Sequence, residues 1–353
     1  MSSPKTYSTP PVIDESKFGV LSWSQNVWMN IKVRLGTPLI IALELLLSPF
    51  VARSKHKPYP RIIGDASFRF LADYFSGPEL QRILGSSVDV YSTWARNANL
   101  PINIEEMEDG GKLMWIGPKK TDKMLLYCHA LVPVSQFPTP LWQTSRAINH
   151  LLTVENVKPS NLVLVGDSAG GNLVSQVLSS MLHPLFTPPI IPRGTQLRGA
   201  YMMSPWISLT GIYDNHPLPS FTENDHCDVI GKESLLTWGQ TVLSGAPNPF
   251  TTDFPYLEPI NAPADWYAHL PDVVDRVFVS TGGAECLRDA DEIFFREKIK
   301  PYHEKCEYYE MEGGVHNDPF FDFQVAEGPL GGKRQGLTPR VLEWVWGCFE
   351  EGK

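Results

Sequence analysis

The hydrophobic pattern of the chain changes character near residue 100. Before that point apolar residues recur every three or four positions, which predicts helices over residues 21–35, 38–53 and 65–84 and a short helix or loop over 88–97. Residues 1–15 are rich in Ser, Thr and Pro, a composition that predicts disorder. Residues 16–100 are therefore expected to form an N-terminal helical cap region.

After residue 100, short apolar runs alternate with helical patterns. Two runs separated by Glu108–Gly111 indicate a hairpin, and strands are expected at 124–128, 162–165, 199–203, 276–281 and 307–311, with helices at 140–153 and 339–349. This alternation predicts an α/β domain over 101–353, with a mostly parallel sheet covered by helices on both faces. Residues 211–270 have weak periodicity and many prolines, which indicates a cap insertion.

One stretch carries a recognisable chemical pattern. Residues Gly166–Gly171 read Gly-Asp-Ser-Ala-Gly-Gly, which fits G-x-S-x-G, and they lie between the buried strand at 162–165 and a helical pattern. Strand, sharp turn and helix are the context of a nucleophile elbow, in which a serine is exposed at the carboxyl edge of the sheet. Small flanking residues are expected because strand and helix approach closely there. Ser168 is the predicted nucleophile.

A serine nucleophile needs a base, usually a histidine oriented by a carboxylate, in the chain order serine, acid, histidine. His316 follows the last strand behind two glycines and is the predicted base. The strand before it is followed by several carboxylates. Glu285 is nearest the strand end and is the predicted acid, with Asp289 as the alternative.

Composition narrows the class of protein. The 353 residues carry a net charge of −9, which disfavours nucleic acid as a partner. The five cysteines have no C-x-x-C spacing, so neither a zinc site nor a disulfide framework is expected, and free thiols indicate a reducing compartment.

The N-terminal part contains one strongly apolar stretch, and its polar first 20 residues predict no cleavable signal peptide. Residues 37–52 are shorter than the roughly 20 residues a spanning helix needs, contain Glu44 and have basic residues on both sides. The stretch is interpreted as an interfacial or cap helix with membrane-surface contact, or alternatively as a spanning anchor. The expected location is cytoplasmic or membrane-associated.

These residues resemble the hormone-sensitive-lipase-like branch of the α/β-hydrolase family over roughly residues 60–350. The resemblance is carried by the Gly-Asp-Ser-Ala-Gly-Gly motif, Ser204-Pro205-Trp206, Glu285–Asp289 and Gly314-Val315-His316. Within that branch the chain looks most similar to arylacetamide deacetylase and steryl acetyl hydrolase. The resemblance implies a carboxylesterase without cofactor or metal, with Ser168, Glu285 and His316 as the catalytic triad. The family more often has aspartate at the acid position.

The chain departs from this family at the oxyanion loop. The family has His-Gly-Gly-Gly after its third strand, whereas here the strand is followed by His129, Ala130 and Leu131. A loop, a helix and one interior strand are interpreted as deleted, about 30 residues in all. The Ala169 N–H is the expected remaining oxyanion donor, with Ala130 or Leu131 as possible substitutes.

Three functions remain open at this point. The first is a serine carboxylesterase or deacetylase acting on a short-chain ester of an apolar alcohol, such as an acetylated sterol or secondary metabolite. The second is a non-catalytic or severely weakened hydrolase remnant that acts as a binding protein. The third is an acyltransferase on the same scaffold. The oligomeric state is not predicted.

Overall fold

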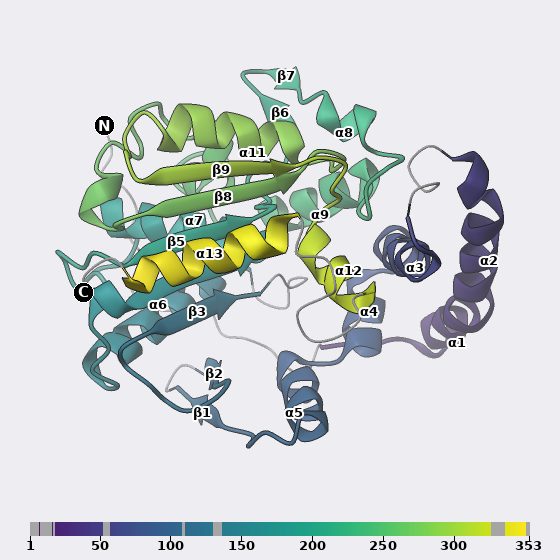
Figure 1. The fold of residues 1–353 in the computed structure, drawn as a ribbon, viewed down its shortest axis with the longest axis horizontal. Coiled ribbons are helices and arrows are strands. Elements are labelled where there is room, and N and C mark those ends of the chain that lie inside the picture. Colours follow the sequence, from purple (N-terminus) through teal and green to yellow (C-terminus); the bar gives the residue numbers. More distant parts are fainter. Residues whose placement is uncertain are drawn as a thin grey trace.

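A computed structural model describes residues 7, 16, 18–51, 57–107, 110–129, 136–325 and 336–350. Its centre is a five-stranded, fully parallel sheet in the order β3-β4-β5-β8-β9 (Figure 1). The strands are β3 (Met124–Cys128), β4 (Leu162–Asp167), β5 (Gly199–Met203), β8 (Val277–Gly282) and β9 (Cys306–Met311). All five strands lie at the predicted places, and the predicted α/β class is confirmed.

Helices cover both faces of the sheet, as predicted. Alternate strand residues such as Leu164, Met202 and Val279 pack into a large core with α6 (Thr139–Thr153), α7 (Ala169–Leu182) and α11 (Arg288–Phe294), which continues as a π-helix, η7 (Phe295–Ile299). Their neighbours Val163, Tyr201 and Phe278 face α13 (Leu337–Glu350). This alternation explains the uniformly apolar strand sequences, because both sides of each central strand are buried.

Strand β3 is the edge of the sheet in the part of the chain that the structure describes. The predicted hairpin forms as β1 (Ile104–Glu106) and β2 (Lys112–Met114), in register Ile104 opposite Met114, but it makes a separate two-stranded sheet. Direct pairing of this hairpin with β3, which would compensate for a missing interior strand, is not observed. Leu125 and Tyr127 on β3 are 49% and 46% exposed.

The N-terminal region is helical as predicted, with one correction. Instead of one helix over residues 65–84 there are two, α3 (Tyr59–Tyr74) and α4 (Gly77–Leu84). The chain breaks because Phe75 is extended and Ser76 forms a capping box with Glu79, followed by Pro78 in the first turn of α4. The other helices are α1 (Trp23–Ile31), α2 (Thr37–Leu47) and α5 (Ser87–Asn97).

The ends of the predicted segments fall partly outside the described residues. Of the N-terminal 15 residues only Tyr7 is described, and its N–H donates to the Leu185 carbonyl. The expected insertion over residues 211–270 holds the short strands β6 (Ile212–Tyr213) and β7 (His216–Pro217) and the helices α8 (Ser220–Glu223), α9 (Lys232–Gly245) and α10 (Phe254–Leu257). The last helix before α13 is α12 (Asp318–Val325).

Candidate active site

The predicted elbow is present between β4 and α7. Ser168 has φ 51° and ψ −119°, a left-handed conformation that costs a non-glycine residue energy and is typical of strained functional turns. Its N–H donates to the Met203 carbonyl at 2.9 Å, and its carbonyl accepts from the Trp206 N–H at 2.9 Å. The end of β5 therefore holds the serine in this conformation.

The glycines around Ser168 are required by close backbone contacts, as expected. A Cβ at Gly166 would lie 2.3 Å from the Gly170 carbonyl oxygen, and one at Gly170 would lie 1.9 Å from the Cys128 carbonyl oxygen. The end of β3 thus passes directly over the first turn of α7. Only glycine fits at either position without moving backbone.

The predicted acid and base come together at the carboxyl ends of β8 and β9. His316 Nδ1 lies 3.3 Å from Glu285 Oε2, and both side chains are fully buried. The contact lacks the alignment of a hydrogen bond and becomes an ion pair when His316 is protonated. Thr281 Oγ1 donates to the other carboxylate oxygen of Glu285. His316 Nε2 has no hydrogen-bond partner among the described residues, and so it is available to a substrate or to Ser168.

The environment of His316 sets its protonation. Burial alone lowers the pKa of the imidazole, but the contact with Glu285 and the charges of Glu285 and Asp228 outweigh burial and raise the pKa above its ordinary value. Because a general base must be unprotonated, activity through His316 is lost as the pH falls through this raised pKa.

The alternative acid, Asp289, has a different environment. Its carboxylate accepts the Ser220 N–H at 2.8 Å and pairs with Arg288. A further carboxyl group, Asp291, is fully buried near Glu285; burial and the charge of Glu285 raise its pKa far above the ordinary range. Of these carboxylates, Glu285 is the one that contacts His316.

A second aspartate, which sequence reasoning missed, joins the acid and base loops. The buried carboxylate of Asp228 accepts the His316 N–H at 2.9 Å through Oδ1 and the Cys286 N–H at 2.8 Å through Oδ2. Burial raises the pKa of Asp228 to about 6, although the nearby His316 opposes the shift. Asp228 comes from the insertion, so the insertion positions both loops.

Two further residues of the insertion bind the same acid loop. Asn224 Nδ2 donates to the Glu285 carbonyl at 2.8 Å, and Ser220 Oγ donates to the Cys286 carbonyl at 2.7 Å. Together with Asp228 they form a series of polar residues spaced four apart, and all three are buried. That spacing, in a segment otherwise rich in prolines, is the signal that could have identified them.

The histidine loop is also joined to the elbow. Asn317 Nδ2 donates to Asp167 Oδ2 at 2.9 Å, and the Asn317 N–H donates to Ser204 Oγ at 3.2 Å. Tyr127 donates from its hydroxyl to the other oxygen of Asp167. The aspartate beside the nucleophile thus connects β3, the elbow and the residue after His316.

The oxyanion site is described only in part. The predicted donor Ala169 is the first residue of α7, where backbone N–H groups have no intrahelical acceptor. Ala130 and Leu131 lie outside the described residues, as does the rest of residues 130–135. The predicted deletion of the oxyanion loop therefore stays a prediction.

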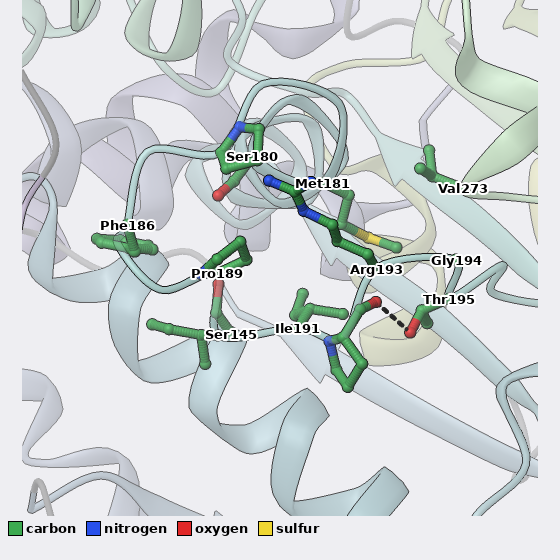
Figure 2. Close-up of a pocket in the computed structure, with 13 residues that line it drawn as sticks. Ser145, Ser180, Met181, Phe186, Pro189, Ile191, Arg193, Gly194, Thr195 and Val273 are labelled. Carbon is green, nitrogen blue, oxygen red and sulfur yellow. Dashed lines mark hydrogen bonds between the residues drawn. The ribbon is translucent and has the colours of Figure 1, made fainter. Parts of the chain in front are cut away.

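Two other features of the described residues resemble ligand sites. Glu105, His150 and Glu155 lie close enough to share a metal ion, but Lys119 Nζ already lies 2.6 Å from both carboxylates. A small pocket lined by Ser145, Phe186 and Ile191 lies at the far end of α7 (Figure 2). Its residue Ser180 is twelve residues from Ser168, roughly 18 Å along the helix. Neither feature belongs to the triad.

Comparison with solved structures places the fold among esterases. An esterase from the bacterial hormone-sensitive lipase family is 20% identical, with a TM-score of 0.57, covering 83% of this chain and 99% of that one. An esterase/lipase from an uncultured bacterium is 20% identical, with a TM-score of 0.55, covering 83% of this chain and 99% of that one. Carboxyl esterase 2 of the fungus Tuber melanosporum is 16% identical, with a TM-score of 0.54, covering 71% of this chain and 87% of that one.

No curated protein matches the chain. A family model does: residues 127–319, more than half of the chain, match the model described as alpha/beta hydrolase fold. That range begins on β3 and ends just after His316, so it includes Ser168, Glu285 and His316. The chain belongs to the alpha/beta hydrolase family, and the fold expected from the sequence is confirmed.

Proposed function

We propose that the chain is a serine carboxylesterase that forms an acyl-enzyme on Ser168. The observation that carries this proposal is the strained elbow at Ser168 together with the buried Glu285–His316 pair at the neighbouring strand ends. A hydrolase remnant without activity has no need for a serine held at φ 51° or for a buried carboxylate–imidazole contact without full hydrogen bonding.

The reaction follows from the three side chains. Ser168 Oγ attacks the ester carbonyl carbon while His316 Nε2 takes the hydroxyl proton, and Glu285 stabilises the resulting imidazolium. The Ala169 N–H is the proposed donor to the oxyanion. His316 then returns the proton to the departing alcohol. A water molecule attacks the acyl-enzyme with His316 again as base, which releases the carboxylic acid and restores the serine.

The substrate we propose is a short-chain acyl ester of an apolar alcohol, such as an acetylated sterol or secondary metabolite. Support comes from the apolar N-terminal helices, which lie on the side to which the parallel strands point (Figure 1). Helix α3 contacts this site directly, since Arg69 Nη1 donates to the Asp228 carbonyl at 2.8 Å.

The test is hydrolysis of p-nitrophenyl acetate by the full chain beside Ser168→Ala. We expect turnover that disappears in the variant, while circular dichroism and the unfolding midpoint stay the same. Turnover equal to the wild type in Ser168→Ala contradicts the assignment of the nucleophile. A folded wild type without turnover supports the binding-protein alternative instead.

The acyltransferase alternative is tested in the same assay. Adding a primary alcohol at increasing concentration measures how the acyl group divides between water and alcohol. Release of p-nitrophenol with free acid as the main product supports hydrolysis, whereas a new ester as the main product at low alcohol concentration supports transfer.

A further inference from the structure

The N-terminal helix has an unusual distribution of apolar side chains. Residues Trp23–Phe50 form one continuous 28-residue helical segment, made of α1, a π-helical turn η2 (Lys32–Gly36), α2 and η3 (Ser48–Phe50). Its most apolar window has a mean hydropathy of 1.5, yet only 6% of that window is buried. The segment stands at the outer edge of the molecule, in purple in Figure 1.

The middle of this helix is held on the rest of the chain. Lys32 Nζ lies 2.7 Å from Glu79 and donates to the Tyr74 carbonyl at 2.8 Å. Gly36 lies against Phe70, where even a Cβ would be 2.7 Å from the ring. A helix fixed through its middle to α3 and α4 cannot cross a bilayer unless these contacts break.

The outer face of α2 has the reverse of the usual pattern. Between Leu35 and Phe50 every exposed residue is apolar, and the largest of them, 43% to 84% exposed, are Leu35, Leu39, Leu43, Leu46, Leu47 and Phe50. The polar residues of the same stretch, Thr37, Glu44 and Ser48, lie on the partly or fully buried side. An apolar strip of this length on the surface marks an interaction site.

The chemistry of the strip favours lipid over a protein partner. Protein interfaces carry about one hydrogen bond per 100–200 Å². The exposed residues of α2 offer no side-chain donor or acceptor at all. At the other end of the helix Trp23 and Trp28 are 83% and 64% exposed, and the amphipathic indole ring prefers the headgroup region of a bilayer. Arg34 is exposed between the two regions and suits anionic headgroups.

We propose that Trp23–Phe50 lies along the surface of a lipid bilayer, with the outer side chains of α2 among the acyl chains, and does not span it. Helix α3 links this surface to the active site, because Arg61 of α3 pairs with Asp318 and Arg69 binds the Asp228 carbonyl. If the proposed esterase function is right, an apolar ester can pass from the bilayer to the active site. Binding of the helix to the membrane does not depend on that function.

The experiment is co-sedimentation of the purified full chain with phosphatidylcholine vesicles, with and without phosphatidylserine. The test variant is Leu39→Glu, Leu43→Glu and Leu46→Glu together. The matched control is Ile116→Glu, Val154→Glu and Ile212→Glu, which changes three exposed apolar residues outside the N-terminal helices. We expect the wild type and the control to bind, and the test variant to lose at least about tenfold in partition coefficient. Equal binding of all three proteins, or no binding by the wild type, overturns the proposal.

Two further measurements distinguish surface binding from a spanning helix and from a dimer formed through the same helix. Bound protein is expected to transfer to a second vesicle population added later, and failure to transfer, with protease protection of the N-terminus, shows a spanning helix and overturns the proposal. Sedimentation velocity without lipid tests a second copy: a wild-type dimer that the test variant converts to monomer, without vesicle binding by either, also overturns it. Hydrolysis of soluble p-nitrophenyl acetate, measured separately, reports on the proposed esterase function and is expected to be unchanged in the test variant.

Discussion

Asp228 Oδ1 accepts the backbone N–H of His316 at 2.9 Å, although the two residues are 88 positions apart in the chain. The same carboxylate accepts the N–H of Cys286, the residue after the proposed acid Glu285. A buried side chain from the insertion therefore joins the loops of Glu285 and His316, in addition to the backbone bonds from Gly283 to Met311 and from Ala284 to Gly314. We classify Asp228 as a positioning residue, since it acts on the proposed reaction only through His316 and Glu285, by its bonds to their loops and by its charge.

Replacing this residue tests the positioning role. Asp228→Asn removes one acceptor and leaves an amide N–H facing a backbone N–H, so we expect kcat/KM to fall about 10–100-fold. Because the Asp228 charge is one of the groups that raise the pKa of His316, its loss lowers that pKa. The acid limb of the kcat/KM profile is expected above pH 6.5 in the wild type and at lower pH in the variant.

The control for this prediction is Asp272→Asn, an aspartate whose side chain is 75% exposed. It is expected to leave both rate and pH profile unchanged. A fall in rate with no displacement of the acid limb in Asp228→Asn shows that the carboxylate only supports loop structure, which contradicts its electrostatic effect on His316.

The identity of the catalytic acid is tested by two matched amide variants. Glu285→Gln keeps the shape of the side chain that contacts His316 but cannot stabilise the imidazolium, so we expect kcat to fall roughly 10³-fold or more. Asp289→Asn disturbs the bond to Ser220 and is expected to affect stability by about 1 kcal/mol with little effect on kcat. Steady-state hydrolysis and urea unfolding of both variants measure this, and the reverse order moves the acid to Asp289.

The contact between β3 and α7 makes a prediction about stability. Gly170→Ala places a Cβ 1.9 Å from the Cys128 carbonyl oxygen, so backbone must move and we expect a loss of at least about 2 kcal/mol together with most of the activity. Gly347→Ala is the control. Gly347 lies within α13, and a Cβ at this position would meet only Arg276 Nη1, at 3.9 Å. There we expect a gain of about 0.5–1 kcal/mol from helix propensity. Equal effects of the two variants in urea unfolding would sink the close-contact argument.

The buried pair between α3 and α12 is tested by charge removal. Arg61→Met leaves Asp318 buried without its partner, so we expect about 3–5 kcal/mol of destabilisation and a loss of activity, since the Asp318 carboxylate also accepts the Val315 N–H beside His316. Adding Asp318→Asn is expected to restore part of the stability.

The control for this prediction is Arg340→Met, at a surface pair with Glu307. It should lower the free energy of unfolding by less than about 1 kcal/mol. If the changes in unfolding free energy of Arg61→Met and Asp318→Asn simply add in the double variant, the two side chains do not pair directly.

The strands and the triad candidates were predictable because their signals are local. The bounds of β3 and β5 match the predicted 124–128 and 199–203, since short uncharged runs followed by a turn allow few alternatives. Ser168, Glu285 and His316 follow strand ends, and parallel strands bring such ends to one edge. The break between α3 and α4 was missed although Ser76, Pro78 and Glu79 carry a helix-start signal.

What the sequence did not reveal depends on long-range packing. The spacing of Ser220, Asn224 and Asp228 could have identified these residues, but they bind a loop about 60 residues further along the chain, and no local signal indicates that target. The separation of the β1–β2 hairpin from β3 is likewise a matter of tertiary arrangement. Hydrophobic periodicity identifies elements, whereas the pairing of a strand edge depends on the geometry of the whole sheet.

The edge position of β3 has a consequence for the behaviour of the protein in solution. Within the described residues, one side of β3 presents unpaired backbone groups, and Leu125 and Tyr127 add half-exposed apolar side chains. Unprotected edges of this kind recruit strands from other molecules, and natural proteins suppress this with charge or covering segments. When the protein partly unfolds, we therefore expect its molecules to assemble through this edge. The half-life of the folded protein at elevated temperature is then set by irreversible aggregation more than by local disruption of the candidate catalytic residues.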